Sequence, residues 1–204
     1  MSKSSWRWDA QRALGANEAS KHHPEHIQKL ITFCHKNSLL SQFSPASQID
    51  LSKAMRLKCF EKDNTVFSQG DPMDNDSCFY IVIIGKLAVY RSDEFELLRK
   101  DGETIQDWWL TSGGSAENID FGTYLGSVLR DAVCGENLTR TVARPASIIA
   151  SEKTTCIQIP LGVLWHCLEE NPDTIITSKS ILDIVLNKPS IDGRKNGDAL
   201  YLAG

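Results

Sequence analysis

The chain has 204 residues, of which 41% are hydrophobic and 24% are charged, and its formal net charge at pH 7 is −4. This length is enough for one globular domain with extended ends, and the apolar content is enough for a core without disulfides. The negative net charge and the lack of a basic stripe argue against a nucleic-acid-binding surface. No apolar run reaches the roughly 18 residues of a membrane span.

The cysteines indicate the cellular compartment. The sequence shows no secretory signal, and its six cysteines are scattered without a C-x-x-C pair: Cys34, Cys59, Cys78, Cys134, Cys156 and Cys167. We therefore expect reduced thiols in a cytoplasmic protein, and neither a disulfide framework nor a zinc site.

Residues 1–24 are polar and show no sustained period, so we expect a disordered or partner-dependent arm. The histidines His22, His23 and His26 could ligate a metal through their ring nitrogens. No cysteine or aspartate completes a ligand set beside them. We interpret them as a solvated helix start with Pro24 in its first turn.

A helical pattern covers residues 25–57. The first helix carries apolar residues at the i, i+3, i+4 and i+7 spacing of one helix face: Ile27, Leu30, Ile31 and Cys34. A second helix begins after Ser44, which can cap it, and Pro45 suits its first position.

Short β-rich runs fill residues 58–160, and pairs of turn-forming residues separate them. Gly70 and Gly85 stand where tight turns need positive φ, so we interpret the runs as a series of hairpins. Many short strands at about ten-residue spacing predict a sandwich, roll or barrel.

The segment from Ser92 to Asp120 is acidic and contains Trp108-Trp109 and a Ser-Gly-Gly-Ser stretch. We interpret it as a pair of outer strands with a flexible loop inserted. The tryptophan pair is interpreted as a core anchor for the roll, with an exposed docking patch as the alternative.

After Pro160 the pattern becomes helical again. Residues 161–187 predict two helices packed on the roll, with a break near Asn171-Pro172, and residues 188–204 read as a polar tail.

The segment from Gly135 to Ala150 concentrates the chemistry. A glycine lets the backbone approach a ligand closely, N–H groups at the start of a short helix attract negative charge, and Arg144 can fork onto phosphate oxygens. The carboxylate of Glu136 can accept hydrogen bonds from hydroxyl groups such as those of a ribose. This segment could therefore hold a small anion that also carries hydroxyls.

Three stretches resemble the cyclic nucleotide-binding domain family. Val66-Phe67-Ser68-Gln69-Gly70-Asp71 looks like the first hairpin of that family, and Phe79 to Tyr90 looks like its central hairpin, with Gly85 in the turn. Arg144 to Ala150, followed by Glu152, Thr154 and Ile159, is similar to the stretch that begins with the phosphate-binding arginine. The resemblance covers roughly Ile27 to Val185.

The resemblance implies an α+β, mainly β fold: an antiparallel double-stranded, jelly-roll-like β-roll with N-terminal and C-terminal helices. In that family a phosphate-binding cassette opens with Gly-Glu, forms one short helix and ends with the arginine. The resemblance thus assigns the ribose to Glu136 and the cyclic phosphate to Arg144, with Gly135, Ala146 and Ser147 lining the pocket.

This cassette departs from the family pattern. It is one residue shorter than usual, and Cys-Gly-Glu-Asn-Leu-Thr replaces the familiar Phe-Gly-Glu-Leu-Ala-Leu. A second register places Gly126 and Ser127 at the Gly-Glu position, where a serine would recognise ribose without a charge. Arg140 is an alternative cation. Trp165 and Tyr201 are candidates for an aromatic lid over the base.

The competing function classes lack their motifs. The sequence has no His-x-His metal pair of a cupin, no Gly-x-Ser-x-Gly elbow, no Gly-x-x-x-x-Gly-Lys loop and no His-Glu-x-x-His helix. We therefore expect no catalytic residues, no metal and no cofactor. Nothing after Val185 is long enough for the recognition helix of a gene regulator.

We expect a non-enzymatic module that binds cAMP or cGMP and acts as an intracellular signal sensor or regulatory subunit with a protein effector. The alternative is a degenerate roll that serves as a protein-interaction module without nucleotide. The preferred base, the effector, the oligomeric state and the cassette register stay open.

Overall fold

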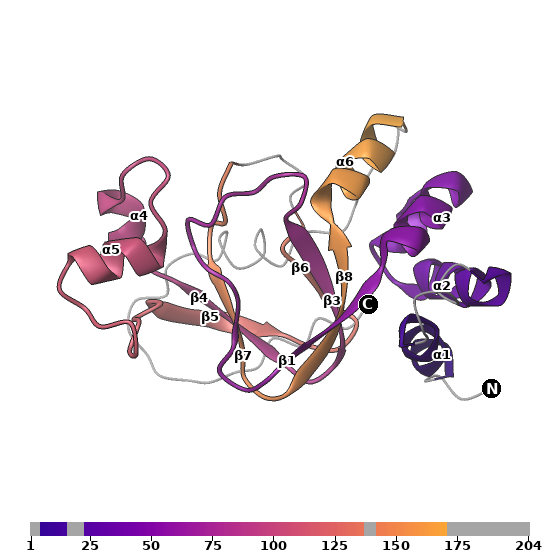
Figure 1. Ribbon diagram of the computed structural model, residues 1–204, viewed down its shortest axis with the longest axis horizontal. Coiled ribbons are helices and arrows are strands. Elements are labelled where there is room, and N and C mark those ends of the chain that lie inside the picture. The colour runs from indigo at the N-terminus through magenta and orange to yellow at the C-terminus, as the bar shows by residue number, and fades with distance from the viewer. Residues whose placement is uncertain (1–4, 16–22, 137–141, 171–204) are drawn as a thin grey trace.

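The computed structural model describes residues 5–15, 23–136 and 142–170 (Figure 1). The helices are α1 (Ser5–Leu14), α2 (Pro24–Lys36), the 3-10 helix η2 (Leu40–Gln42), α3 (Pro45–Ala54), α4 (Asp93–Leu98), α5 (Ile105–Thr111) and α6 (Leu161–Glu170). The strands are β1 (Arg56–Phe60), β2 (Thr65–Phe67), β3 (Cys78–Ile84), β4 (Leu87–Arg91), β5 (Thr123–Val128), β6 (Val133–Cys134), β7 (Ser147–Ala150) and β8 (Thr154–Pro160).

The strands form two antiparallel sheets with the orders β1-β8-β3-β6 and β2-β7-β4-β5. An apolar interior between the sheets receives side chains from both, among them Phe67, Val82, Val89, Ile148 and Cys156. Helices lie at the two ends of this roll, with α1 to α3 on one side and α4 and α5 on the other (Figure 1). The predicted antiparallel β-roll with flanking helices is confirmed.

The predicted series of hairpins is wrong. Strand β3 belongs to the first sheet and β4 to the second, so Gly85, with φ of +93°, turns the chain from one sheet to the other. Within the described residues, β4 and β5 are the one pair of consecutive strands that hydrogen-bond to each other. Alternation of apolar residues shows which face a strand buries, but it does not show which partner the strand takes.

Strand β3 of the first sheet is buried on both faces. Phe79, Ile81 and Ile83 of β3 pack against the cluster that the N-terminal helices and α6 build, whereas Val82 points between the sheets. A strand buried on both faces needs apolar residues at successive positions. This explains the uninterrupted apolar run from Phe79 to Ile84.

The N-terminal region differs from the polar arm that the sequence indicates, because Ser5–Leu14 form α1. The ring of Trp6 lies 5.2 Å from that of Phe33 on α2. Arg7 forms a two-pronged ion pair with Asp131 in the turn before β6. Three small or apolar residues at the i, i+3, i+4 spacing are buried against the other helices: Ala10, Ala13 and Leu14.

The segment predicted as outer strands with a loop folds instead into two short helices. Ser92 caps α4 by accepting from the Phe95 N–H, and Thr104 and Asp107 form a capping box at α5. The two tryptophans are half-buried within this segment. Trp108 packs edge-on against Phe95, and the Trp109 indole donates to the Ser115 carbonyl.

After the roll, α6 packs its Leu161, Leu164 and Cys167 into the same cluster as α2 and α3. The second predicted C-terminal helix and the tail at 188–204 lie outside the described residues.

Candidate functional site

The main chain of Arg144 is held by the turn after β2. The Gly70 N–H donates to the Arg144 carbonyl oxygen at 2.8 Å, and the Arg144 N–H donates to the Asp71 carbonyl oxygen at 2.8 Å. The Met73 N–H extends this pairing by donating to the Val142 carbonyl oxygen at 2.9 Å. The glycine-aspartate turn therefore fixes the backbone of Arg144 just before the chain enters β7.

The guanidinium of Arg144 is buried at only 4% exposure. Nη1 donates to the Gly135 carbonyl oxygen at 2.7 Å, and Nη2 donates to the Cys78 carbonyl oxygen at 2.7 Å. The Cζ atom lies 4.1 Å from the centroid of the Phe67 ring. The cation thus has a fixed place between β3, the cassette and an aromatic face.

Burial is the strongest influence on the charge of Arg144 and lowers the pKa of its guanidinium, against the attraction of Tyr80, Cys134, Asp71 and Cys78. Burial also raises the pKa of the Tyr80 phenol to about 12 and that of both thiols above 9.0. These three groups are neutral at pH 7, so Asp71 alone among the four can supply negative charge. An anion entering the site would therefore offset part of the desolvation of Arg144.

Gly135 is where the cassette backbone meets the arginine. It has φ of +79°, and a Cβ atom there would lie 2.9 Å from both Arg144 Nη1 and a ring carbon of Phe67. Glu136 follows directly and is buried at 9% exposure. The structure thus brings Gly135 and Arg144 into contact, and Glu136 is the next residue along the chain. Residues 137–141, including Arg140, lie outside the described part of the chain.

No protein-family model matches this sequence, and no curated protein sequence matches it either. Solved structures do. The sensor domain of the transcriptional regulator DNR from Pseudomonas aeruginosa superposes with a TM-score of 0.53 at 18% identity, over 74% of this chain and 83% of that one. The regulatory domain of Toxoplasma gondii PKA, crystallised with cAMP, gives a TM-score of 0.51 at 15% identity, over 72% of this chain and 47% of that one.

A third match is the regulatory subunit of a cAMP-independent protein kinase A from Trypanosoma cruzi bound to guanosine, with a TM-score of 0.51 at 16% identity over 72% of this chain. The chain has the cyclic nucleotide-binding fold. It spans 43% of the Trypanosoma cruzi regulatory subunit. At these identities the likeness concerns the fold alone.

Within the cyclic nucleotide-binding fold, Ala146 and Ser147 follow Arg144 into β7. Ala146 is fully buried in the interior between the sheets. The hydroxyl of Ser147 accepts from the Gln69 N–H at 2.8 Å, which ties β7 to the turn after β2. Their role in lining a ligand pocket stays a prediction.

The residues of the alternative cassette register, Gly126 and Ser127, belong to a strand. Gly126 and Ser127 lie within β5, opposite Val89 and Ala88 of β4. The Ser127 hydroxyl lies 2.6 Å from that of Tyr124, and its neighbour Val128 points into the interior. Because successive side chains of a strand alternate, Ser127 faces outward.

Of the two candidates for an aromatic lid, Trp165 lies within the described residues and Tyr201 does not. Trp165 is half-buried on α6, where it lines an open hollow of about 670 Å³ together with Asp76, His166 and Glu169. Tyr201 lies outside the described part of the chain.

The sequence did not indicate the two groups that hold the arginine besides Gly135. Phe67 belongs to the first family-like hairpin, but its contact with a cation depends on tertiary pairing. The Cys78 carbonyl is a main-chain group and leaves no signal in the sequence. The Gly70-Asp71 turn was the one sequence signal for this part of the site, because its backbone pairs with that of Arg144.

Across residues 5–15, 23–136 and 142–170, no group of three or more His, Cys, Asp or Glu side chains is arranged to hold a metal ion. None of the helices in those ranges combines the length and apolar character that crossing a membrane requires.

Proposed function

We propose that this domain binds a cyclic nucleotide, cAMP or cGMP, and works as an intracellular sensor or regulatory module. One observation carries the proposal: Arg144 is buried beside the turn after β2, and burial lowers the pKa of its guanidinium. A guanidinium has five N–H donors, and the two carbonyl bonds use two of them. A cyclic phosphate would bring the compensating charge to Arg144.

The neighbouring carboxylate supports a nucleotide over inorganic phosphate. Glu136 follows Gly135, whose carbonyl is already bonded to Arg144, so a carboxylate and a cation flank one short stretch of backbone. A carboxylate accepts from sugar hydroxyls and repels phosphate. The pair therefore suits a ligand that carries both groups, with Glu136 at the ribose and Arg144 at the phosphate.

Regulatory and sensor domains among the structural neighbours support a non-enzymatic role. We propose that occupancy shifts the population between two arrangements of the C-terminal helices, of which α6 packs against the roll. A protein effector would read that shift, and the expected location is the cytoplasm.

Calorimetric titration of the full chain tests the proposal with cAMP, cGMP and their parent nucleosides. We expect a cyclic nucleotide to bind more tightly than its nucleoside, and Arg144→Lys to weaken the nucleotide about tenfold or more, because lysine cannot fork onto two oxygens. The nucleoside should be unaffected. Arg91→Lys, a half-buried arginine on β4, is the matched control.

Two further variants separate the cassette registers. Glu136→Gln should weaken nucleotide and nucleoside equally, because both carry the ribose, whereas Ser127→Ala should change neither. The reverse pattern would assign the ribose to Ser127. No binding of either nucleotide to the wild-type chain would refute the sensor function.

A further inference from the structure

The segment between β4 and β5, residues 92–120, exposes apolar side chains; we call it the α4–α5 insertion. Of the seven large hydrophobic residues that are exposed among the described residues, four lie between residues 97 and 124: Leu97, Leu98, Leu110 and Tyr124. Leu97 is 83% exposed, more than any of the other three. Tyr124 belongs to β5, just after the insertion. Apolar exposure is therefore concentrated at one end of the molecule (Figure 1).

The insertion is firmly attached to the roll. The buried Gln69 accepts from the Ser92 N–H at 2.9 Å through its side-chain oxygen, and its amide donates to the Glu96 carboxylate at 3.1 Å. The Ile105 N–H donates to the Gln69 carbonyl at 2.9 Å. Phe95 and Ile105 are fully buried. The exposed leucines thus stand on an ordered scaffold, which lowers the entropy cost of docking.

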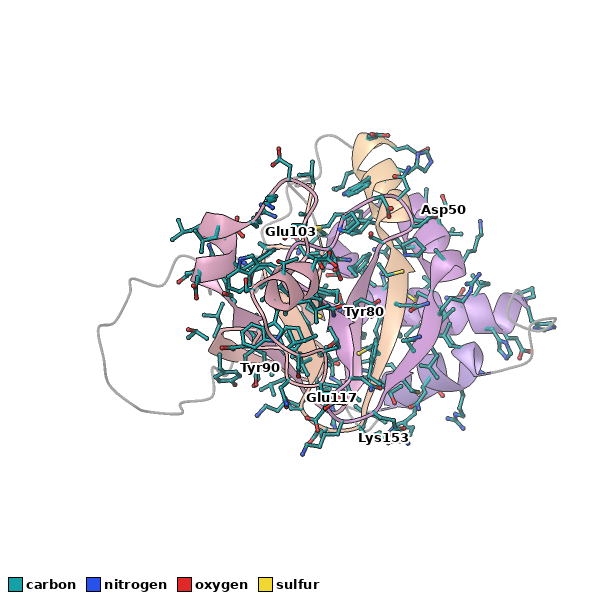
Figure 2. All side chains as sticks on the ribbon, turned by 60° about the vertical axis from the view of Figure 1, so that its left-hand side comes forward. Asp50, Tyr80, Tyr90, Glu103, Glu117 and Lys153 are labelled. Carbon is teal, nitrogen blue, oxygen red and sulfur yellow. The ribbon has the colours of Figure 1, made fainter. Side chains whose placement is uncertain are left out.

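The same insertion is strongly acidic. Residues 92–120 contain eight of the 26 acidic residues of the chain and two of its 22 basic residues, so the remainder of the chain is slightly basic. Glu103 and Glu117 belong to this segment and are labelled in Figure 2, which turns the insertion towards the viewer. The surface therefore combines exposed leucines with a negative field.

We propose that the α4–α5 insertion docks a partner segment that is both basic and apolar, such as a helix with lysines or arginines beside leucines. Charge complementarity selects this partner, and Leu97 and Leu98 supply the apolar contact. An anionic lipid surface would meet the carboxylates with like charge. A second copy in two-fold symmetry would likewise place one acidic insertion against the other.

A synthetic helical peptide of lysine and leucine, labelled with a fluorophore, is the probe for the test. Fluorescence anisotropy with the full chain should show binding that weakens as salt is added. Replacing the lysines of the peptide by glutamates should abolish binding. The double variant Leu97→Ser with Leu98→Ser should weaken it about tenfold or more, since two apolar contacts are lost.

Matched variants distinguish docking at the insertion from non-specific binding of the peptide elsewhere on the surface. Ile49→Ser removes an exposed apolar residue on α3 and should leave affinity unchanged. Glu94→Gln with Asp101→Asn should weaken binding and reduce its salt dependence, whereas the exposed Glu152→Gln should not. An equal loss for Ile49→Ser, or no loss for the leucine variant, would overturn the proposal.

Sedimentation velocity of the unlabelled chain tests the second-copy alternative. We expect a monomer at the concentrations of the peptide assay. A dimer that Leu97→Ser dissociates would show that another copy covers this surface, and it would overturn the basic partner. Nucleotide binding by the same variants should stay unchanged, so this result is independent of the proposed function.

Discussion

Gly135→Ala tests whether the backbone and Arg144 are as tightly fitted as the structure shows. The new methyl group would lie 2.9 Å from Arg144 Nη1 and 2.9 Å from a ring carbon of Phe67. Such contacts are shorter than van der Waals distance, so Arg144 must retract from the Gly135 carbonyl, which it now approaches to 2.7 Å. Both the hydrogen bond from Arg144 to the Gly135 carbonyl and the contact of Arg144 with the Phe67 ring should weaken.

The expected magnitude has two parts. Alanine at positive φ costs about 1–2 kcal/mol at any site. Overpacking and the weakened charged hydrogen bond add roughly 2–3 kcal/mol at Gly135. Gly102 provides the control, because it has the same φ of +79° and a Cβ atom there would meet nothing within 4 Å.

Urea unfolding followed by tryptophan fluorescence measures both variants. Gly135→Ala should lower the free energy of unfolding by about 2–3 kcal/mol more than Gly102→Ala does. Equal losses would refute the reasoning, since they would mean that backbone strain alone explains the effect and that Arg144 is not confined by Gly135.

Asp131→Asn removes the charge that pairs with Arg7 but keeps a residue that tolerates the positive φ of 70°. We expect the free energy of unfolding to fall by about 1 kcal/mol, and by less at high salt. Urea unfolding at two salt concentrations measures this. Burial raises the pKa of the Asp71 carboxyl above 3.8, so the folded state binds this proton more readily than the unfolded state does. The free energy of unfolding should therefore fall as pH rises from 3.8 through the raised pKa, and Asp71→Asn should remove this slope in acidic urea titrations. In alkylation followed by mass spectrometry, the exposed Cys59 should react first, whereas Cys156, whose pKa burial raises to about 12, should react only after unfolding; early labelling of Cys156 would contradict its burial.

Apolar alternation and turn residues predicted the strands of the roll, because a two-layer fold must bury one face of each strand. The same patterns gave a wrong prediction for the α4–α5 insertion, which is helical. Its helices have six and seven residues, which is too short for a helical period to emerge. Their stability comes from caps and from the buried Gln69, whose position depends on tertiary packing. The pairing of the strands could not be predicted either, because it also depends on tertiary packing.

Helix α1 was missed because two of its three buried positions are alanines, which scarcely stand out in a polar sequence. In the site, the resemblance singled out Arg144, which the structure places three residues before β7; its role in binding phosphate stays a prediction. The groups around it depend on how residues 70–73 pair with 142–144. Such pairing between distant segments is a property of the folded chain and has no local pattern.

The strand order has a consequence for synthesis on the ribosome. β8 pairs with both β1 and β3 in the first sheet, and β7 pairs with both β2 and β4 in the second. These central strands are the last two of the roll to be translated. The second sheet cannot close before Ala150 has left the exit tunnel, and the first cannot close before Pro160 has done so. Until then the earlier strands keep unpaired edges. A nascent chain stalled before Thr154 should therefore be far more sensitive to protease than one stalled well beyond α6.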